Sequence, residues 1–346
     1  MPRNPDKFLL TLILIGLTAG SAAAESLVAG GYQEAVFSVS DARDFSDTLA
    51  TVAGWEIVHE GDVDRAVLAA WGLSASVAAR EVLLRNPGTE RGYVRLVEFI
   101  GADRRQIRSN AQSWETGGWF DVNARVVDMA TTFERFQAAN WQATSDPVEF
   151  SFGPFIVSEW LARGPDGIVF ALIERIEPPL EGWPELRQVS RIFNATQIVA
   201  DIDAAKAFYI DALGFEVYLE HDGPSEVDGP NVLGLPHNLA TSVPRQVAIV
   251  HPEGSNEGSI ELLAFDGVHG RDFSDLAKPP NLGIVMLRFP VTDMDAFAAH
   301  AAERRLDVAT PPTEVSVPPY GSIEVMSLRG PGGVWLEFYE STSELY

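Results

Sequence analysis

The sequence contains no cysteine and has few basic residues, and both shortages limit what the protein can do. Without cysteine there is no disulfide framework, no thiol nucleophile and no thiolate metal site. Lysine and arginine number 25 against 49 aspartates and glutamates, which gives a formal net charge of −24. Nucleic acids and anionic membrane surfaces repel such a chain, so we expect neither as a partner.

The sequence also lacks the glycine-rich loops that bind phosphates and the G-x-S-x-G turn of serine hydrolases. Its glycine-rich pieces are typical of hairpin turns. Histidine is scarce, with six in 346 residues. Five of the six lie where strand ends, loops or a helix are expected. His237, in GLPHNLA, lies in a loop or short helix that is a candidate cover for a cavity, so we keep it as a candidate ligand contact.

The first 24 residues have the three parts of a secretory signal peptide. Arg3 and Lys7 precede an apolar run from Phe8 to Leu17, and three alanines end the segment. We expect cleavage before Glu25 and a periplasmic or secreted protein. An uncleaved anchor is the alternative, but about ten to twelve apolar residues are too few to span about 30 Å of hydrocarbon. Cleavage changes the charge from 25 − 49 = −24 to 23 − 48 = −25, so we expect the mature protein to be acidic and free of the membrane.

The most informative stretch runs from Asn194 to Glu220 and carries the signals of a strand, a helix and a second strand. Asp201 or Asp203 supplies a helix-capping oxygen, and apolar side chains then follow at i, i+3, i+4 and i+7. Gly214 stands where a left-handed residue ends a helix. The alternating residues after it predict the second strand.

This layout also occurs 160 residues earlier. Residues 34–60 align with it at a constant offset, so that Asp41 matches Asp201. Weaker copies lie at 120–175 and 284–340, each with a tight turn, Gly-Pro-Asp-Gly or Gly-Pro-Gly-Gly, before its last strand. The pattern predicts a tandem repeat of four modules.

The segment VADIDAAKAFYIDALGFEVYLE resembles the opening of a module of the vicinal oxygen chelate superfamily, which includes glyoxalase I, bleomycin-resistance proteins and extradiol dioxygenases. The resemblance implies an α+β fold of four βαβββ modules in two pairs, each pair forming a curved mixed sheet around a cavity. We assign consecutive modules to each pair. The expected segments are a signal peptide at 1–24, a first pair at 30–178 with modules at 31–100 and 119–178, a linker at 179–189, and a second pair at 190–342 with modules at 190–266 and 282–342.

In catalytic members of that superfamily, the first and last strands of a module carry the ligands of a divalent metal. The equivalent positions in the first pair are Glu34, Arg95, Asp121 and Ala171. A guanidinium replaces a ligand there, so we expect Arg95 to be buried and paired with Glu34, Asp121 or both. The equivalent positions in the second pair are Asn194, Glu261, Met286 and Glu337.

Of that second set, Asn194, Glu261 and Glu337 are the candidate metal ligands, for a hard ion such as Mg²⁺ or Mn²⁺. Because no histidine is present in the set, our expectation is that the protein has no cofactor. Strand alternation adds further side chains to the same cavity. The candidate ligand-binding residues are Asn194, Glu261, Arg288, Trp335, Glu337, Tyr339 and His237.

Aromatic walls with a few polar points are typical of small-molecule sites, although the same aromatics can simply fill the curve of the sheet. The altered metal positions favour a binding protein that holds a small organic molecule in its second half, as a monomer or a homodimer. The alternative is a metal-dependent lyase, isomerase or dioxygenase in which Glu261 or Glu337 moves a proton. A third possibility is an interaction module of the cell envelope. The sequence identifies neither the ligand nor a catalytic residue.

Overall fold

The computed structural model describes residues 27–152 and 154–341. The predicted signal peptide and its cleavage site lie outside the described residues. Within the described part, no helix is long and apolar enough to cross a membrane.

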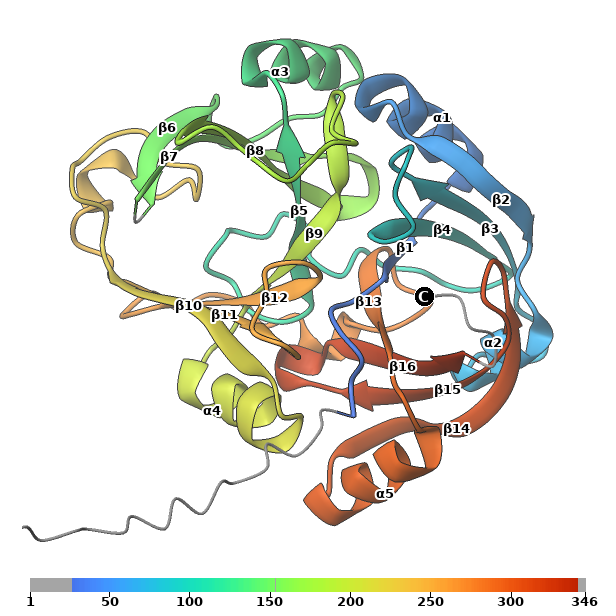
Figure 1. The fold of residues 1–346 in the computed structure, drawn as a ribbon. Coiled ribbons are helices and arrows are strands. Elements are labelled where there is room, and N and C mark those ends of the chain that lie inside the picture. The colour runs from blue at the N-terminus through green and yellow to red at the C-terminus, as the bar shows by residue number, and fades with distance from the viewer. Residues whose placement is uncertain (1–26, 153, 342–346) are drawn as a thin grey trace, which may run out of the picture.

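Four modules follow one another along the chain, each built as βαβββ (Figure 1). The first contains β1 (Glu34–Ser38), α1 (Ala42–Ala53), β2 (Glu56–Asp62), α2 (Arg65–Ala70), β3 (Ala78–Arg85) and β4 (Tyr93–Ile100). The second contains β5 (Trp119–Val126), α3 (Met129–Ala138), β6 (Val148–Phe152), β7 (Phe155–Arg163) and β8 (Val169–Glu177). The third contains β9 (Val189–Ile198), α4 (Ile202–Lys206), β10 (Glu216–Gly223), β11 (Arg245–His251) and β12 (Ser259–Phe265). The fourth contains β13 (Gly283–Pro290), α5 (Met294–Arg304), β14 (Asp307–Val317), β15 (Gly321–Arg329) and β16 (Trp335–Ser341).

An aspartate caps the main helix of each module. Asp41, Asp128, Asp201 and Asp293 each accept a hydrogen bond from the backbone N–H three residues on, at 2.6 to 2.9 Å. These bonds satisfy N–H groups that the first turn of a helix leaves without a partner. The predicted cap at Asp201 is confirmed. A π-helical segment, Ala207–Ala212, continues that helix, and Gly214 follows it with a φ of 77°, the left-handed conformation that favours glycine.

The described strands form two eight-stranded mixed sheets, sheet A and sheet B. Sheet A has the order β14-β15-β16-β13-β1-β4-β3-β2, and sheet B has the order β10-β11-β12-β9-β5-β8-β7-β6. Sheet A therefore joins the first module to the fourth, and sheet B joins the second to the third. The predicted fold class, four modules in two paired and curved sheets, is confirmed (Figure 1).

The expected pairing of consecutive modules is wrong. Strand β1 pairs antiparallel with β13, where Glu34 lies opposite Arg288, and β5 pairs antiparallel with β9, where Asn123 lies opposite Asn194. Every module offers its first strand for this contact, so the repeat itself does not determine which two modules meet.

The linkers 101–118 and 266–281 connect the two sheets. Each leaves one sheet and enters the other, and they run beside each other where the Thr116 N–H donates to the Arg271 carbonyl at 3.1 Å. The segment between β8 and β9, which was expected to separate two pairs, instead connects two modules of sheet B.

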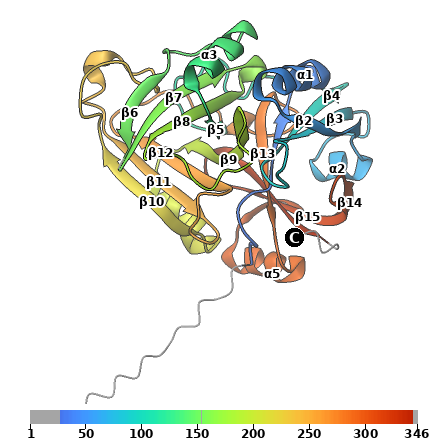
Figure 2. The ribbon, with the colours of Figure 1, turned by 45° about the horizontal axis from the view of Figure 1, so that its top comes forward.

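One continuous core contains side chains from α1, α3, α4 and α5 and from both sheets. Phe37 of β1 meets Phe170 of β8 edge to face, with ring centroids 6.0 Å apart, and Phe45 of α1 meets Trp141 at the same distance. Helices α1 and α3 lie side by side across this junction (Figures 1 and 2). The two sheets curl away from the shared core, which leaves each with a concave face of its own (Figure 1).

Candidate functional site

Strand alternation places polar side chains on the concave face of each sheet, and we call these faces cup A and cup B. In cup A, Glu337, Arg288 and Glu34 are neighbours on β16, β13 and β1. In cup B, Glu261, Thr196 and Asp121 are neighbours on β12, β9 and β5. The eight positions equivalent to metal ligands are therefore redistributed. Sheet A contains Glu34, Arg95, Met286 and Glu337, and sheet B contains Asp121, Ala171, Asn194 and Glu261.

A network of buried ion pairs crosses cup A. Arg95 binds Glu34 through two hydrogen bonds of 2.7 and 2.9 Å and forms an ion pair with Glu81 at 2.9 Å. Arg288 bridges Glu34 and Glu337, at 2.5 Å from each. The side chains of these two arginines are at most 1% exposed. Three carboxylates thus meet two guanidinium groups, so most of the charge is compensated inside the sheet.

Further hydrogen bonds complete this network. The Trp71 indole N–H donates to Glu337 at 2.8 Å, and the Tyr320 hydroxyl donates to Glu34 at 3.1 Å. Burial opposes the ionisation of Glu34, but Arg95 and Arg288 outweigh it and lower the pKa of Glu34. The carboxylates of cup A are therefore committed to protein partners.

The prediction that Arg95 is buried and paired with Glu34, Asp121 or both is confirmed through Glu34. The side chain is buried and paired with Glu34 as expected. Asp121, the other partner considered, does not contact Arg95 because it belongs to the other sheet. Glu81 of β3, which the family positions did not include, is the second partner.

Apolar side chains fill the rest of cup A. Met286, Trp335 and Tyr339 belong to one buried cluster, in which Trp335 is 5% exposed and Tyr339 is fully buried. The concave face of sheet A thus holds four of the candidate ligand-binding residues in its packing: Arg288, Trp335, Glu337 and Tyr339. The candidate metal set is separated as well, since Glu337 lies in sheet A while Asn194 and Glu261 lie in sheet B. Alternation predicted the face of each residue, and the wrong strand partner caused the error.

Cup B is lined by amides and hydroxyls around Asn123. The Asn123 amide nitrogen donates to Asn194 Oδ1 at 2.8 Å, to Thr196 Oγ1 at 3.2 Å and to Asp121 Oδ1 at 3.3 Å. The Asn194 amide nitrogen donates to Ser259 Oγ at 2.7 Å. These bonds join β5, β9 and β12 across the floor of the cup.

Three carboxylates of cup B influence one another electrostatically, and none of them forms an ion pair among the described residues. Burial raises the pKa of Asp121 to about 7, despite a hydrogen bond from Thr196. Burial, with the nearby Glu261 and Asp121, raises the pKa of Glu159 to about 8. Burial and Asp121 raise the pKa of Glu261 to about 8. Such groups change protonation near neutral pH, which is typical of functional sites.

The segment before β11 covers part of cup B, and His237 lies in it. Leu235 and Val243 are buried in the same apolar cluster as Phe120 and Leu263 of the sheet. His237 itself is exposed, so the structure does not bring this candidate residue to the cup. The remaining candidates, Asn194 and Glu261, do lie in cup B.

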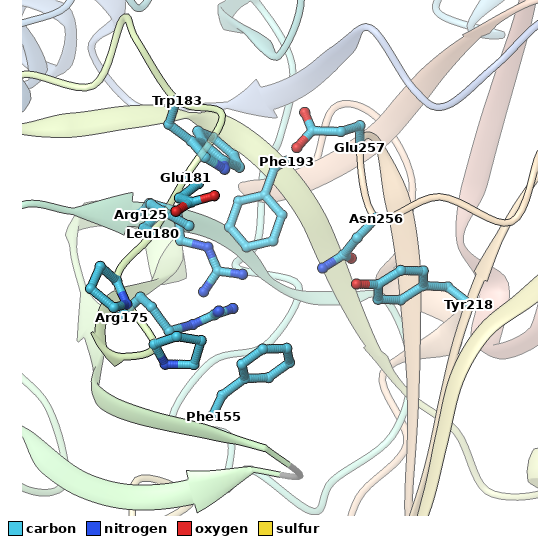
Figure 3. Close-up of a pocket in the computed structure, with 12 residues that line it drawn as sticks. Arg125, Phe155, Arg175, Leu180, Glu181, Trp183, Phe193, Tyr218, Asn256 and Glu257 are labelled. Carbon is cyan, nitrogen blue, oxygen red and sulfur yellow. The ribbon is translucent and has the colours of Figure 1, made fainter.

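A cavity of about 450 Å³ lies at the end of cup B nearest β8 and the segment 178–183, and its lining does not include Asp121, Glu159 or Glu261 (Figure 3). Arg125 of β5 and Arg175 of β8 point into it between aromatic rings. Alternation along β5 is the sequence signal for Arg125, because it follows Asp121 and Asn123 on the same face. The same alternation along β8 places Arg175 on the face of Ala171, whereas no comparable signal identified the aromatic residues, which four separate segments bring together.

Several donor atoms at the positions equivalent to metal ligands are missing or already bonded to protein groups. Among the described residues, no three histidine, aspartate or glutamate side chains converge closely enough to hold one. In cup A, the carboxylates form ion pairs with Arg95 and Arg288. In cup B, Ala171 has no side-chain donor, and the Asn194 oxygen already accepts a hydrogen bond from Asn123.

Residues 191–338 match the family model of the Glyoxalase/Bleomycin resistance protein/Dioxygenase superfamily. Among solved structures, the fold is similar to glyoxalase I from Zea mays, with a TM-score of 0.59, 16% identity, and coverage of 90% of this chain and 93% of that chain. It is also similar to a provisionally assigned dioxygenase from Bacillus subtilis subsp. subtilis str. 168, with a TM-score of 0.56, 14% identity, and coverage of 93% and 87%. No curated protein matches the sequence.

These matches define the class of the protein. Its fold is that of the vicinal oxygen chelate proteins, with two curled sheets formed from βαβββ modules. The sequence match assigns residues 191–338 to the glyoxalase, bleomycin-resistance and dioxygenase superfamily.

Proposed function

We propose that this chain is a binding protein that holds a small organic molecule in cup B, while cup A is structural. The contrast between the cups carries this proposal. In cup A the charged groups neutralise one another and aromatic side chains fill the space. In cup B, Asp121, Glu159 and Glu261 form no ion pair among the described residues, and a cavity of about 450 Å³ lies at the end of the cup. That volume lies in the range of small-molecule sites.

We further propose that the metal site of the superfamily is degenerate in this chain. The guanidinium groups of cup A and the missing donor at Ala171 in cup B support this. The alternative of catalysis rests on Glu261. With its pKa raised to about 8, this side chain is protonated at neutral pH and can donate a proton to a ligand. Turnover of a bound compound in the presence of chelator would favour this alternative.

The proposed location is the periplasm or the exterior, which the composition of residues 1–24 supports. N-terminal sequencing of exported protein is expected to begin at or near Glu25. Both sheets are completed within one chain, so a monomer suffices for the fold and a homodimer is not required.

A ligand screen with one variant in each cup tests the binding proposal. Melting temperature is measured against sugars, amino acids, aliphatic and aromatic acids, amides and alcohols, and hits are titrated by calorimetry. We expect Glu261→Gln in cup B to weaken binding of a hit, and Trp335→Phe in cup A to leave its affinity unchanged. A screen without hits, or binding that only Trp335→Phe weakens, would contradict the proposal.

A further inference from the structure

The cavity beside cup B has a composition that the neighbouring carboxylates do not explain. Its walls are aromatic and come from β7, β9, β10 and the segment 178–183, and two arginines reach in from β5 and β8 (Figure 3). The Arg125 guanidinium lies 4.4 Å from the ring centroid of Phe193, and that of Arg175 lies 3.8 Å from the ring centroid of Phe155. Each cation therefore rests on a ring and faces the cavity.

Neither guanidinium has a hydrogen-bond acceptor among the described residues, and the Nε atom of each is buried without a partner. Arg125 is 8% exposed. Other buried arginines are satisfied. Arg95 and Arg288 bind carboxylates, and Arg108 donates to the carbonyl oxygens of Gly117 and Glu115 at 2.8 and 2.7 Å. Arg125 and Arg175 thus stand apart in a chain where acidic residues outnumber basic ones 49 to 25.

The carboxylates near this pair do not neutralise it. Glu257 lines the cavity, but it accepts hydrogen bonds from Arg191 at 3.1 and 2.5 Å. Glu181 also lines the cavity and is exposed to solvent. Glu159 is protonated at neutral pH because burial raises its pKa to about 8. Burial and the adjacent Arg175 lower the pKa of Arg125 to about 10, and they outweigh the opposite effect of Glu159 and Glu257.

We propose that Arg125 and Arg175 bind the oxyanion of a small organic molecule, a carboxylate or a phosphate ester, whose planar apolar body packs on the aromatic walls. The inference rests on the proposed function and names the ligand class of the same site. Guanidinium groups present N–H donors in a planar fork that matches both oxyanions. The Tyr218 hydroxyl and the Asn256 amide point toward the same space and add two polar contacts (Figure 3). Phe155 and Trp183 supply apolar surface for a ring.

Calorimetry with matched aryl probes tests this inference. The probes are 2-naphthoate, its neutral amide 2-naphthamide, 2-naphthyl phosphate and inorganic phosphate. We expect saturable binding of 2-naphthoate or 2-naphthyl phosphate, at least tenfold weaker binding of the amide, and no comparable binding of inorganic phosphate, which lacks the planar body. Comparison of the two aryl anions identifies which oxyanion the site prefers.

Substitution of the arginines separates binding from folding. Arg125→Gln and Arg175→Gln should each weaken the aryl anion at least tenfold, since bonds between charged groups are the strong ones. Arg187→Gln, an exposed arginine outside the cavity, is the charge-matched control and should leave the affinity unchanged. Arg125→Gln should also keep or raise the melting temperature of the ligand-free protein, because it removes an unpaired buried charge. A structural arginine would instead lower that temperature.

The outcomes distinguish this inference from the proposed function. Equal binding of acid and amide, or aryl anion binding that neither Arg125→Gln nor Arg175→Gln weakens, would overturn the anion site and leave binding in cup B standing. If neither aryl anion bound but a neutral compound bound elsewhere in cup B, the anion site would also be overturned and binding in cup B would still stand. Failure of every probe together with an empty ligand screen would overturn both proposals.

Discussion

Arg95 and Arg125 show how one residue type serves two purposes in this fold. Both are buried arginines on the concave face of a sheet. Arg95 contacts Glu34 and Glu81, so its charge is neutralised within the protein. Arg125 rests on Phe193 and faces a cavity. We therefore expect substitution of the first to cost stability and substitution of the second to cost affinity.

The stability half of this contrast is tested by Arg95→Met, which keeps the length of the side chain and removes its charge. Loss of this partner leaves the buried Glu81 carboxylate without its arginine and Glu34 with Arg288 alone. We expect the free energy of unfolding to fall by about 3 to 5 kcal/mol, measured by urea denaturation. The exposed Arg187→Met is the control and should change it by less than about 0.5 kcal/mol. An unchanged midpoint for Arg95→Met would mean that the network of cup A contributes nothing.

At the scale of the element, the sequence predicted the secondary structure of each module. The capping aspartate at Asp201 and the left-handed Gly214 mark the helix ends, because backbone groups there need a specific partner or conformation. Alternation also predicted which face Glu337 and Glu261 occupy. It did not predict that β13 pairs with β1 in place of β9, because all four first strands present equivalent edges. Alternation placed Arg125 on the concave face, but the cavity itself was not predicted, since its lining comes from segments far apart in the chain.

Carboxyl groups on three strands of sheet B make the free energy of unfolding depend on pH. Asp121 of β5, Glu159 of β7 and Glu261 of β12 have pKa values raised to about 7, 8 and 8, against roughly 4 in an unfolded chain. Between those values the folded chain holds more protons than the unfolded chain, so the free energy of unfolding falls as pH rises. We expect the melting temperature to be highest near pH 5 and to decline toward pH 8, with a loss of roughly 2 kcal/mol or more.

The double variant Glu159→Gln, Glu261→Gln should flatten this decline, since glutamine stays neutral throughout. Glu34 changes the free energy of unfolding with pH in the opposite direction. Its pKa is lowered in the folded state, so the stability that it contributes is lost only as pH falls below the ordinary range of a carboxyl. A melting temperature of the unmodified chain that rose between pH 5 and pH 8 would be incompatible with uncompensated carboxylates in cup B.

At the scale of the whole molecule, the observed pairing of modules gives one chain two complete cups with different contents. Sheet A combines the first and fourth modules, whose arginines and glutamates close one cup. Sheet B combines the second and third modules, whose carboxylates and arginines stay available for a ligand. The common core between the sheets holds the two cups in one body. A filled cup beside an accessible one is the arrangement from which we infer a single binding site.

Hydrogen–deuterium exchange with and without 2-naphthoate, read by mass spectrometry, tests this claim most directly. We expect the probe to slow exchange in β5, β8 and the segment 178–183, which border the cavity, and to leave β1, β13 and β16 unchanged. The unliganded strands of sheet A serve as the internal control in the same sample. Protection confined to β1, β13 and β16 would place the ligand in cup A and contradict the account.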